Sequence, residues 1–148
     1  MDELVNKLKV SLADTFVFYL KSHYYHWNVE GPDFSQYHEL LKEIYEEVFG
    51  AVDFIAEHIR TLDAYAPGSL KRFSELTTLE EDNTIPSSLD MLKRLLDDNN
   101  KVINTLIDSY KAAEAANEYG LANFIQDRID VHKKHGWMLR ATTKDNKK

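Results

Sequence analysis

The strongest indication of a chemical site in this chain is a set of two histidines and two carboxylates: His26, His38, Asp53 and Glu57. Imidazole and carboxylate groups together suit iron, and zinc or manganese would accept the same ligands. Asp53 and Glu57 are four residues apart, so on a helix they lie one above the other, spaced to hold one cation. Such a pair is more often a solvated helix face. The two histidines are therefore needed before the carboxylates indicate a metal site.

The elements that position these residues are predicted to be helices. Apolar residues recur at three- and four-residue spacing, and only three prolines and five glycines interrupt them. We expect long helices at about 2–27, 34–62, 87–116 and 121–141, with a short helix at 69–76. Ser87 and Asp90 form a capping box at the start of the third long helix. Its apolar face should consist of Leu89, Leu92, Leu96, Ile103, Leu106 and Ile107.

The order of these helices predicts the fold class. Four long helices with one long crossover, between the second and the third, are typical of the ferritin-like four-helix bundle. We therefore predict an all-α fold with one domain, residues 1–141, and a short extra helix in the crossover. Residues 142–148 have no apolar anchor and should form a flexible C-terminal tail.

Composition excludes several other classes of protein. The 148 residues include no cysteine, which removes thiolate metal sites, disulfides and thiol catalysis. The formal net charge is −7, so the folded body should repel nucleic-acid phosphates. No stretch approaches the ~18 apolar residues of a transmembrane helix, and the N-terminus lacks the pattern of a signal peptide. We expect a soluble, cytoplasmic protein that does not bind membranes.

One copy of the chain cannot bring all four ligands to one ion. On a single helix, His38 and Asp53 are fifteen residues apart, or roughly 22 Å at ~1.5 Å per residue. Two such helices, antiparallel about a two-fold axis near residues 45–49, would bring His38 of one copy to Asp53 and Glu57 of the other. His26 would join them, and each dimer would hold two equivalent sites. A centre in the middle of the bundle is not expected, because no histidine occurs in a Glu-x-x-His pattern.

Four segments of the chain closely resemble the Dps family of mini-ferritins, and the resemblance extends over essentially the whole length. The segments are HYYHWNVEGPDFSQYH, VDFIAEHIR, GSLKRFSELT and HKKHGWMLRA. The resemblance implies a hollow homo-dodecamer built on two-fold dimers. It also implies a ferroxidase that oxidises Fe(II), preferentially with hydrogen peroxide rather than oxygen, and stores the ferric mineral in its cavity.

The resemblance also implies a role for each matching residue. His26 and His38 would form one side of the ferroxidase site, and Asp53 and Glu57 of the two-fold related subunit would form the other. Trp27 would lie beside the site as an electron donor that limits the escape of radicals.

Two departures from the family pattern change these expectations. Lys42 stands where the family often has an acidic residue, four positions after the second histidine, and its positive charge would repel a second metal ion. Whether one or two irons bind is therefore open.

The lysine-rich N-terminal extension of DNA-binding members is missing, because the first helix begins almost at Met1. DNA binding is not expected from the few basic residues near the C-terminus, which are Arg140, Lys144, Lys147 and Lys148.

Other polar residues on the last helix have two possible interpretations each. Asp127 and Asp130 would line an ion-entry pore at a three-fold contact or form a solvated face, and Asn123 stands where many family members have aspartate. His132 and His135 have the spacing of a metal pair, but packing and hydrogen bonding explain such histidines more often.

Two further functions compete with the ferroxidase. The first is a DNA-compacting structural cage with weak or no oxidation, against which the acidic charge and the missing basic arm argue. The second is a helical interaction module with a degenerate metal site, for which Lys42 is the only support.

Overall fold

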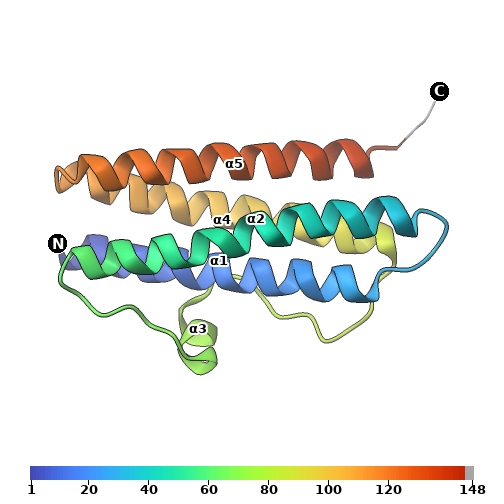
Figure 1. Ribbon diagram of the computed structural model, residues 1–148, viewed down its shortest axis with the longest axis horizontal. Coiled ribbons are helices and arrows are strands. Elements are labelled where there is room, and N and C mark those ends of the chain that lie inside the picture. The colour runs from blue at the N-terminus through green and yellow to red at the C-terminus, as the bar shows by residue number, and fades with distance from the viewer. Residues whose placement is uncertain (146–148) are drawn as a thin grey trace.

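Four long helices lie side by side, and one short helix lies across their outside (Figure 1). The structure is a computed structural model that describes residues 1–145. Its helices are α1 (Asp2–Asn28), α2 (Phe34–Thr61), α3 (Leu70–Leu76), α4 (Ser88–Ala115) and α5 (Tyr119–Thr143). The predicted all-α, ferritin-like four-helix bundle with an extra helix in its crossover is confirmed. None of the helices within residues 1–145 has a stretch long and apolar enough to span a membrane.

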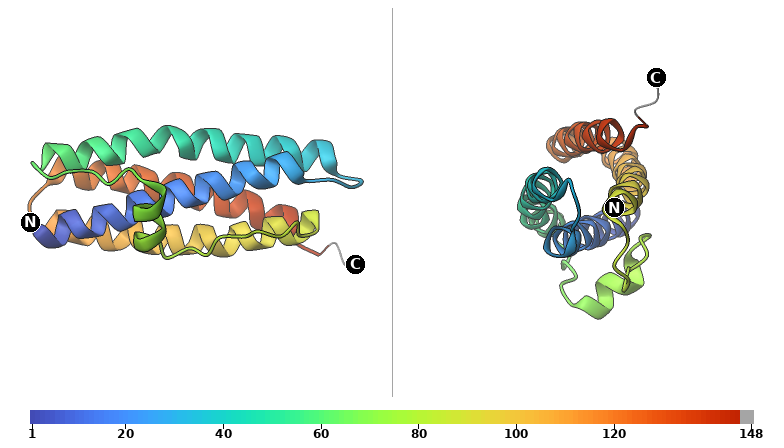
Figure 2. Two further views of the ribbon diagram at one scale, coloured as in Figure 1. Left: turned by 90° about the horizontal axis from the view of Figure 1, so that it is seen from below. Right: turned by 90° about the vertical axis from the view of Figure 1, so that its right-hand side faces the viewer.

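The connections decide which helices are neighbours. Helices α1 and α2 form an antiparallel pair, as do α4 and α5, and α1 also packs along α4. The crossover from α2 to α4 runs back along the bundle and carries α3 against the outer side of α1, which the end view shows clearly (Figure 2). Helices α2 and α5 contact each other less closely than the other neighbouring pairs.

Side-chain caps define where several helices begin. Ser87 Oγ accepts from the Asp90 backbone N–H at 3.2 Å, as the capping box predicts, and Ser69 Oγ caps α3 in the same way. Helix α5 begins at Tyr119, two residues earlier than predicted, because Asn117 takes a left-handed φ of 59° and ends α4 in a tighter corner.

The end of α5 also differs from the prediction. The helix continues to Thr143, so the first two residues of the predicted tail are helical. Thr142 and Thr143 donate their hydroxyl hydrogens to carbonyls one turn earlier, at 2.7 and 2.9 Å, so both hydroxyl groups have partners within the helix. Residues 146–148 of the predicted tail lie outside the described residues.

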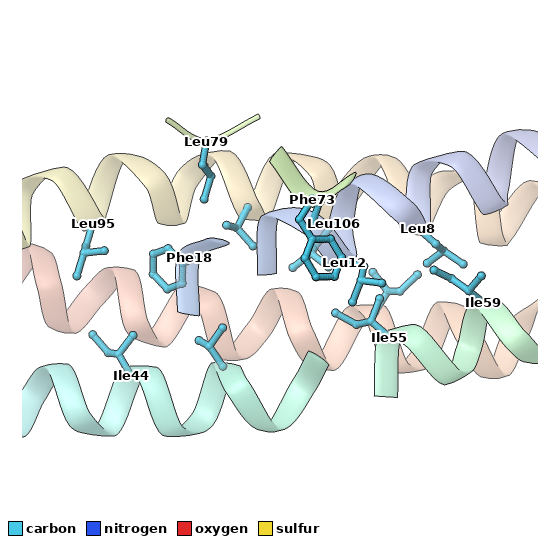
Figure 3. Packing of buried hydrophobic residues seen from close by; sticks show 14 of the residues in the cluster. Leu8, Leu12, Phe18, Ile44, Ile55, Ile59, Phe73, Leu79, Leu95 and Leu106 are labelled. Atoms are coloured by element: carbon cyan, nitrogen blue, oxygen red, sulfur yellow. The ribbon is translucent and has the colours of Figure 1, made fainter. Parts of the chain in front are cut away.

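The core runs along the whole bundle axis (Figure 3). Leucines, isoleucines and one phenylalanine from the long helices meet there, and each fully buried side chain of this kind contributes about 1.5–3 kcal/mol. The labelled members are Leu8, Leu12, Phe18, Ile44, Ile55, Ile59, Leu95 and Leu106, with Phe73 of α3 and Leu79 of the crossover packed against them.

The buried face of α4 includes Leu92, Ile103 and Leu106, as predicted, but it differs from the prediction at other positions. Leu89 is 36% exposed, while Met91, Leu95 and Val102 are buried in the core. The buried face also carries polar residues whose partners lie on other helices. Asp98 forms a salt bridge of 2.8 Å with Lys21, for example. These polar positions interrupt the apolar pattern, so hydrophobic spacing alone misses part of the buried face.

Buried carboxylates hold the crossover against the bundle. Asp14, which is fully buried in α1, accepts hydrogen bonds from the Thr77 hydroxyl at 2.6 Å and from the Thr78 N–H and hydroxyl, each at 2.7 Å. Further along, Asp82 accepts from Tyr25 of α1 and Arg94 of α4. These contacts provide partners for polar groups of a long loop that has little secondary structure.

A polar network bridges α2 and α5 at mid-bundle. Glu47 accepts from Arg128 and from His135 Nε2, the latter at 2.8 Å. Fully buried His132 donates from Nδ1 to Asn99 Oδ1 at 2.8 Å and accepts from Arg128 at its Nε2, at 3.1 Å. Both ring nitrogens of His132 are thus occupied. The expectation that His132 and His135 are packing and hydrogen-bonding residues is confirmed.

Candidate metal centre

The corner between α1 and α2 brings two of the four predicted ligands together. His26 is in the last turn of α1 and His38 is in the second turn of α2. The chain reverses between them over residues 29–33, where Gly31 adopts a φ of 122° that a side chain would disfavour. The Phe34 N–H donates to the Gly31 carbonyl at 3.1 Å and closes the turn.

The two histidines are tied to each other by reciprocal hydrogen bonds. His26 Nδ1 donates to the His38 carbonyl at 2.8 Å, and His38 Nδ1 donates to the His26 carbonyl at 2.9 Å. Because a carbonyl oxygen can only accept, each Nδ1 must carry the hydrogen, and in the neutral ring each Nε2 keeps its lone pair. The rings stack with centroids 3.7 Å apart and planes 19° apart. This geometry fixes both tautomers in the form that binds a metal through Nε2.

Asp53 and Glu57 lie on the exposed side of α2, toward its C-terminal end. They share one face of the helix, as predicted, but His38 is on the same helix fifteen residues before Asp53. Within residues 1–145 of one chain, no three potential metal ligands come together. The structure therefore places the histidine half and the carboxylate half of the set at separate positions, and their meeting across two copies stays a prediction.

Lys42 is exposed on α2, one turn after His38. Its ammonium group is thus on the same side of the helix as the histidine pair. Around that pair the chain offers two imidazoles and one cation. A first metal ion would find ligands here, while a second would meet a positive charge.

Aromatic rings surround the histidine pair, and the sequence reasoning did not identify most of them. His23 stacks on Tyr45 with centroids 3.8 Å apart and planes 9° apart, and Trp27 lies 4.2 Å from His23. Tyr45 in turn lies edge-on to His26 at 5.1 Å. Burial, and then the nearby His26, lower the pKa of His23, which favours its neutral form. The spacing of Tyr19, His23 and Trp27 at i, i+4 and i+8 was the available signal.

Trp27 is 59% exposed, and three phenylalanines of α2 are exposed as well. Phe34, at the start of α2, is 42% exposed, and Phe49 and Phe54, further along α2, are 54% and 57% exposed. Large apolar side chains along one helix, flanked by polar residues, are typical of a surface that another protein covers.

The carboxylates of the last helix lie in a different place. Asp127 and Asp130 are exposed on α5, around an open hollow that Tyr110 and Lys133 also line. Asn123 is exposed on the same helix. Their role in an ion-entry pore stays a prediction, because it depends on neighbouring copies.

Comparisons with known proteins agree with the fold described above. The ferritin-like domain family matches residues 5–148. A DNA protection during starvation protein of Brevibacillus brevis is 30% identical over 135 residues, covering 90% of this chain and 90% of that protein. Antigen TpF1 of Treponema pallidum is 34% identical over 146 residues, covering 95% of this chain and 80% of the antigen.

Solved structures match equally well. The crystal structure of antigen TpF1 superposes with a TM-score of 0.92 at 31% identity, over 96% of this chain and 92% of that one. A Dps protein of Vibrio cholerae O1, described as a member of a broad superfamily of ferritin-like diiron-carboxylate proteins, has a TM-score of 0.92 at 28% identity. That match covers 97% of this chain and 90% of the other.

Proposed function

Because the chain belongs to the ferritin-like family, and within it to the Dps mini-ferritins, we propose that it is a ferroxidase that oxidises Fe(II) and stores the ferric mineral. The observation that carries the proposal is the reciprocal pairing of His26 and His38, which leaves the Nε2 lone pair of each stacked ring available. Iron is the substrate of this site and is held only until it is oxidised. The proposed setting is the cytoplasm.

Each site is proposed to lie between two subunits. His26 and His38 of one subunit would bind Fe(II) together with Asp53 and Glu57 of its two-fold partner. The exposed Phe49 is located where the proposed axis crosses α2, and burying it against a second copy would stabilise the dimer. Twelve such subunits would form the cage that retains the mineral.

The proposed oxidant is hydrogen peroxide, with oxygen as the slower alternative. Over a complete cycle, one peroxide oxidises two Fe(II) ions and, with two protons, yields two waters. Removing Fe(II) and peroxide together would protect DNA without any contact with it. This fits an acidic chain with a net charge of −7 better than DNA compaction does.

Trp27 is proposed to donate electrons to oxidants that leave the site and so to limit the escape of radicals. Its ring lies against His23, two ring contacts from the histidine pair. Its indole group remains accessible to solvent on one side.

The test is iron oxidation by the purified, metal-free protein. Fe(II) is added without oxygen, peroxide follows, and ferric absorbance and retained iron are measured. A variant carrying His26→Ala and His38→Ala should lose most of the fast phase. The matched control, His58→Ala, removes a histidine of α2 that packs on Phe124 instead and should keep that phase. If the wild type shows no fast ferric absorbance and retains no iron, the ferroxidase proposal is wrong.

A further inference from the structure

Five side-chain rings form a continuous line from the histidine pair along the boundary between α1 and α2. His38 stacks on His26, His26 meets Tyr45 edge-on at 5.1 Å, and Tyr45 stacks on His23 at 3.8 Å. His23 then meets Tyr19, with centroids 5.6 Å apart and a hydrogen bond of 3.0 Å between the Tyr19 hydroxyl and His23 Nδ1. The line thus joins two helices and ends at a tyrosine that is hydrogen-bonded to a base.

Tyr19 differs from the other oxidisable rings near the site. In the neutral imidazole with hydrogen on Nε2, His23 Nδ1 accepts the Tyr19 hydroxyl hydrogen. Among residues 1–145, the Tyr45 hydroxyl has no hydrogen-bond partner, and Trp27 is mostly exposed. Phe49 packs 4.7 Å from the half-buried Tyr19 ring and shields it on one side. A phenol that loses an electron must also lose its proton, and of the two tyrosines in this line only Tyr19 has an acceptor among residues 1–145.

The need for such a donor rests on the expectation that Lys42 limits each site to one Fe(II) at a time. A site that holds one Fe(II) at a time can give peroxide only one electron, although reduction to water requires two. One-electron reduction would release hydroxide and a hydroxyl radical, and that radical would damage the protein. A second electron from the protein, delivered in the same event, avoids this product.

We propose that Tyr19 supplies this second electron and that His23 takes up its phenolic proton. The inference rests on the proposed ferroxidase function. In the step, peroxide accepts one electron from the bound Fe(II) and one from Tyr19, and two protons from solvent complete two waters. Fe(II) becomes Fe(III), Tyr19 becomes a neutral phenoxyl radical, and its proton moves to His23 Nδ1. The next Fe(II) at the site returns one electron to the radical, and His23 returns the proton.

Tyr45 connects the donor to the site in this scheme. Its ring contacts His23 on one side and His26 on the other, so the electron moves from Tyr19 toward the iron ligands through stacked rings. Replacing Tyr45 with phenylalanine keeps both contacts and should leave the Tyr19 radical in place.

The experiment mixes the assembled, iron-free protein with one Fe(II) per subunit and then with peroxide. Samples are frozen at successive times for electron paramagnetic resonance, and ferric absorbance is recorded in parallel. The wild type should show a transient tyrosyl signal that narrows when the protein contains ring-deuterated tyrosine. Tyr19→Phe should lose this signal and release several-fold more hydroxyl radical to a spin trap. Tyr119→Phe, which changes an exposed tyrosine on α5, is the matched control and should behave as the wild type.

His23→Gln tests the proton acceptor separately, because an amide accepts a hydrogen bond but does not take up the proton. It should lose the tyrosyl signal while still oxidising iron. An unchanged tyrosyl signal in Tyr19→Phe would overturn the proposal, as would a radical that stays broad in deuterated protein and therefore belongs to Trp27.

A second experiment needs no iron, so it tests the role of Tyr19 independently of the proposed ferroxidase function. A photogenerated ruthenium(III) complex oxidises the iron-free protein by one electron, and the yield of tyrosyl radical is measured. The wild type and Tyr119→Phe should give equal yields, and Tyr19→Phe should give several-fold less. Equal yields in all three proteins would contradict the role of Tyr19. Missing ferric absorbance in the first experiment would contradict only the proposed ferroxidase function.

Discussion

Sharing of each site between two subunits makes a quantitative prediction about mixed cages. One variant lacks the histidines (His26→Ala with His38→Ala), and a second lacks the carboxylates (Asp53→Ala with Glu57→Ala). Neither variant alone can form a complete site. In a mixed dimer, one of the two sites combines the intact carboxylates of the first variant with the intact histidines of the second. The other site loses all four ligands.

The expected activity follows from the two-fold symmetry. When the two variants are unfolded together at equal concentrations and refolded, random pairing makes about half of the dimers mixed, and about one quarter of the wild-type sites are restored. The assay is the fast phase of ferric absorbance per subunit, compared with refolded wild type. Cages refolded separately and mixed afterwards should show no recovery, because their dimers stay uniform.

The refutation is equally specific. A mixture of single variants His26→Ala and His38→Ala is the matched control, because both changes are in the same half and every mixed site still lacks one imidazole. If the first mixture recovers no more of the fast ferric phase than this control mixture, each site lies within one chain. Light scattering must show assembled cages in every sample, so that a loss of activity is not a loss of assembly.

Three further predictions concern single residues. Lys42→Asp should add an oxygen ligand in place of a repelling cation and raise the number of Fe(II) bound per subunit in an anaerobic titration; an unchanged number would contradict the assigned role of Lys42. Asp14→Ala leaves the crossover threonines without their buried acceptor and should cost about 3 kcal/mol, seen as a lower thermal midpoint at fixed protein concentration, whereas the exposed Asp108→Ala should change little. Burial alone would raise the pKa of Glu47, but hydrogen bonds from His135 and Arg128 lower it from 4.5 to about 2. Its stabilisation is therefore complete above pH 4.5 and is lost as the pH falls toward 2. With allowance for its one-third exposed side chain, Glu47→Gln should be less stable by about 1–2 kcal/mol at pH 6, a gap that should narrow by pH 3 in thermal unfolding.

Helix positions could be predicted from the sequence because their causes are local. Spacing of apolar residues, serine caps and the Gly31-Pro32 corner act within a few residues, and the structure confirms the helices they predict. The separation of His38 from Asp53 is also local, since one continuous helix fixes the rise between them. The prediction that a second copy completes the set of four candidate ligands follows from that separation.

Only the tertiary structure decided features that depend on contacts between residues distant in sequence, such as which residues of α4 are buried. Asp98 and Asn99 are on the buried face of α4 because Lys21 and His132 pair with them from other helices, and no local pattern reveals such partners. For the same reason the predicted apolar face of α4 was wrong at Leu89.

The histidine pair shows the same division. The sequence determined that His26 and His38 flank a tight corner and that imidazoles are available for iron. Only the packed corner decided that each Nδ1 donates to the other residue's carbonyl, which leaves each Nε2 free, and that Tyr45 links the pair to His23. Spacing along a chain sets which residues are near one another, but hydrogen-bond direction and ring stacking depend on rotamers, and the surrounding helices select those.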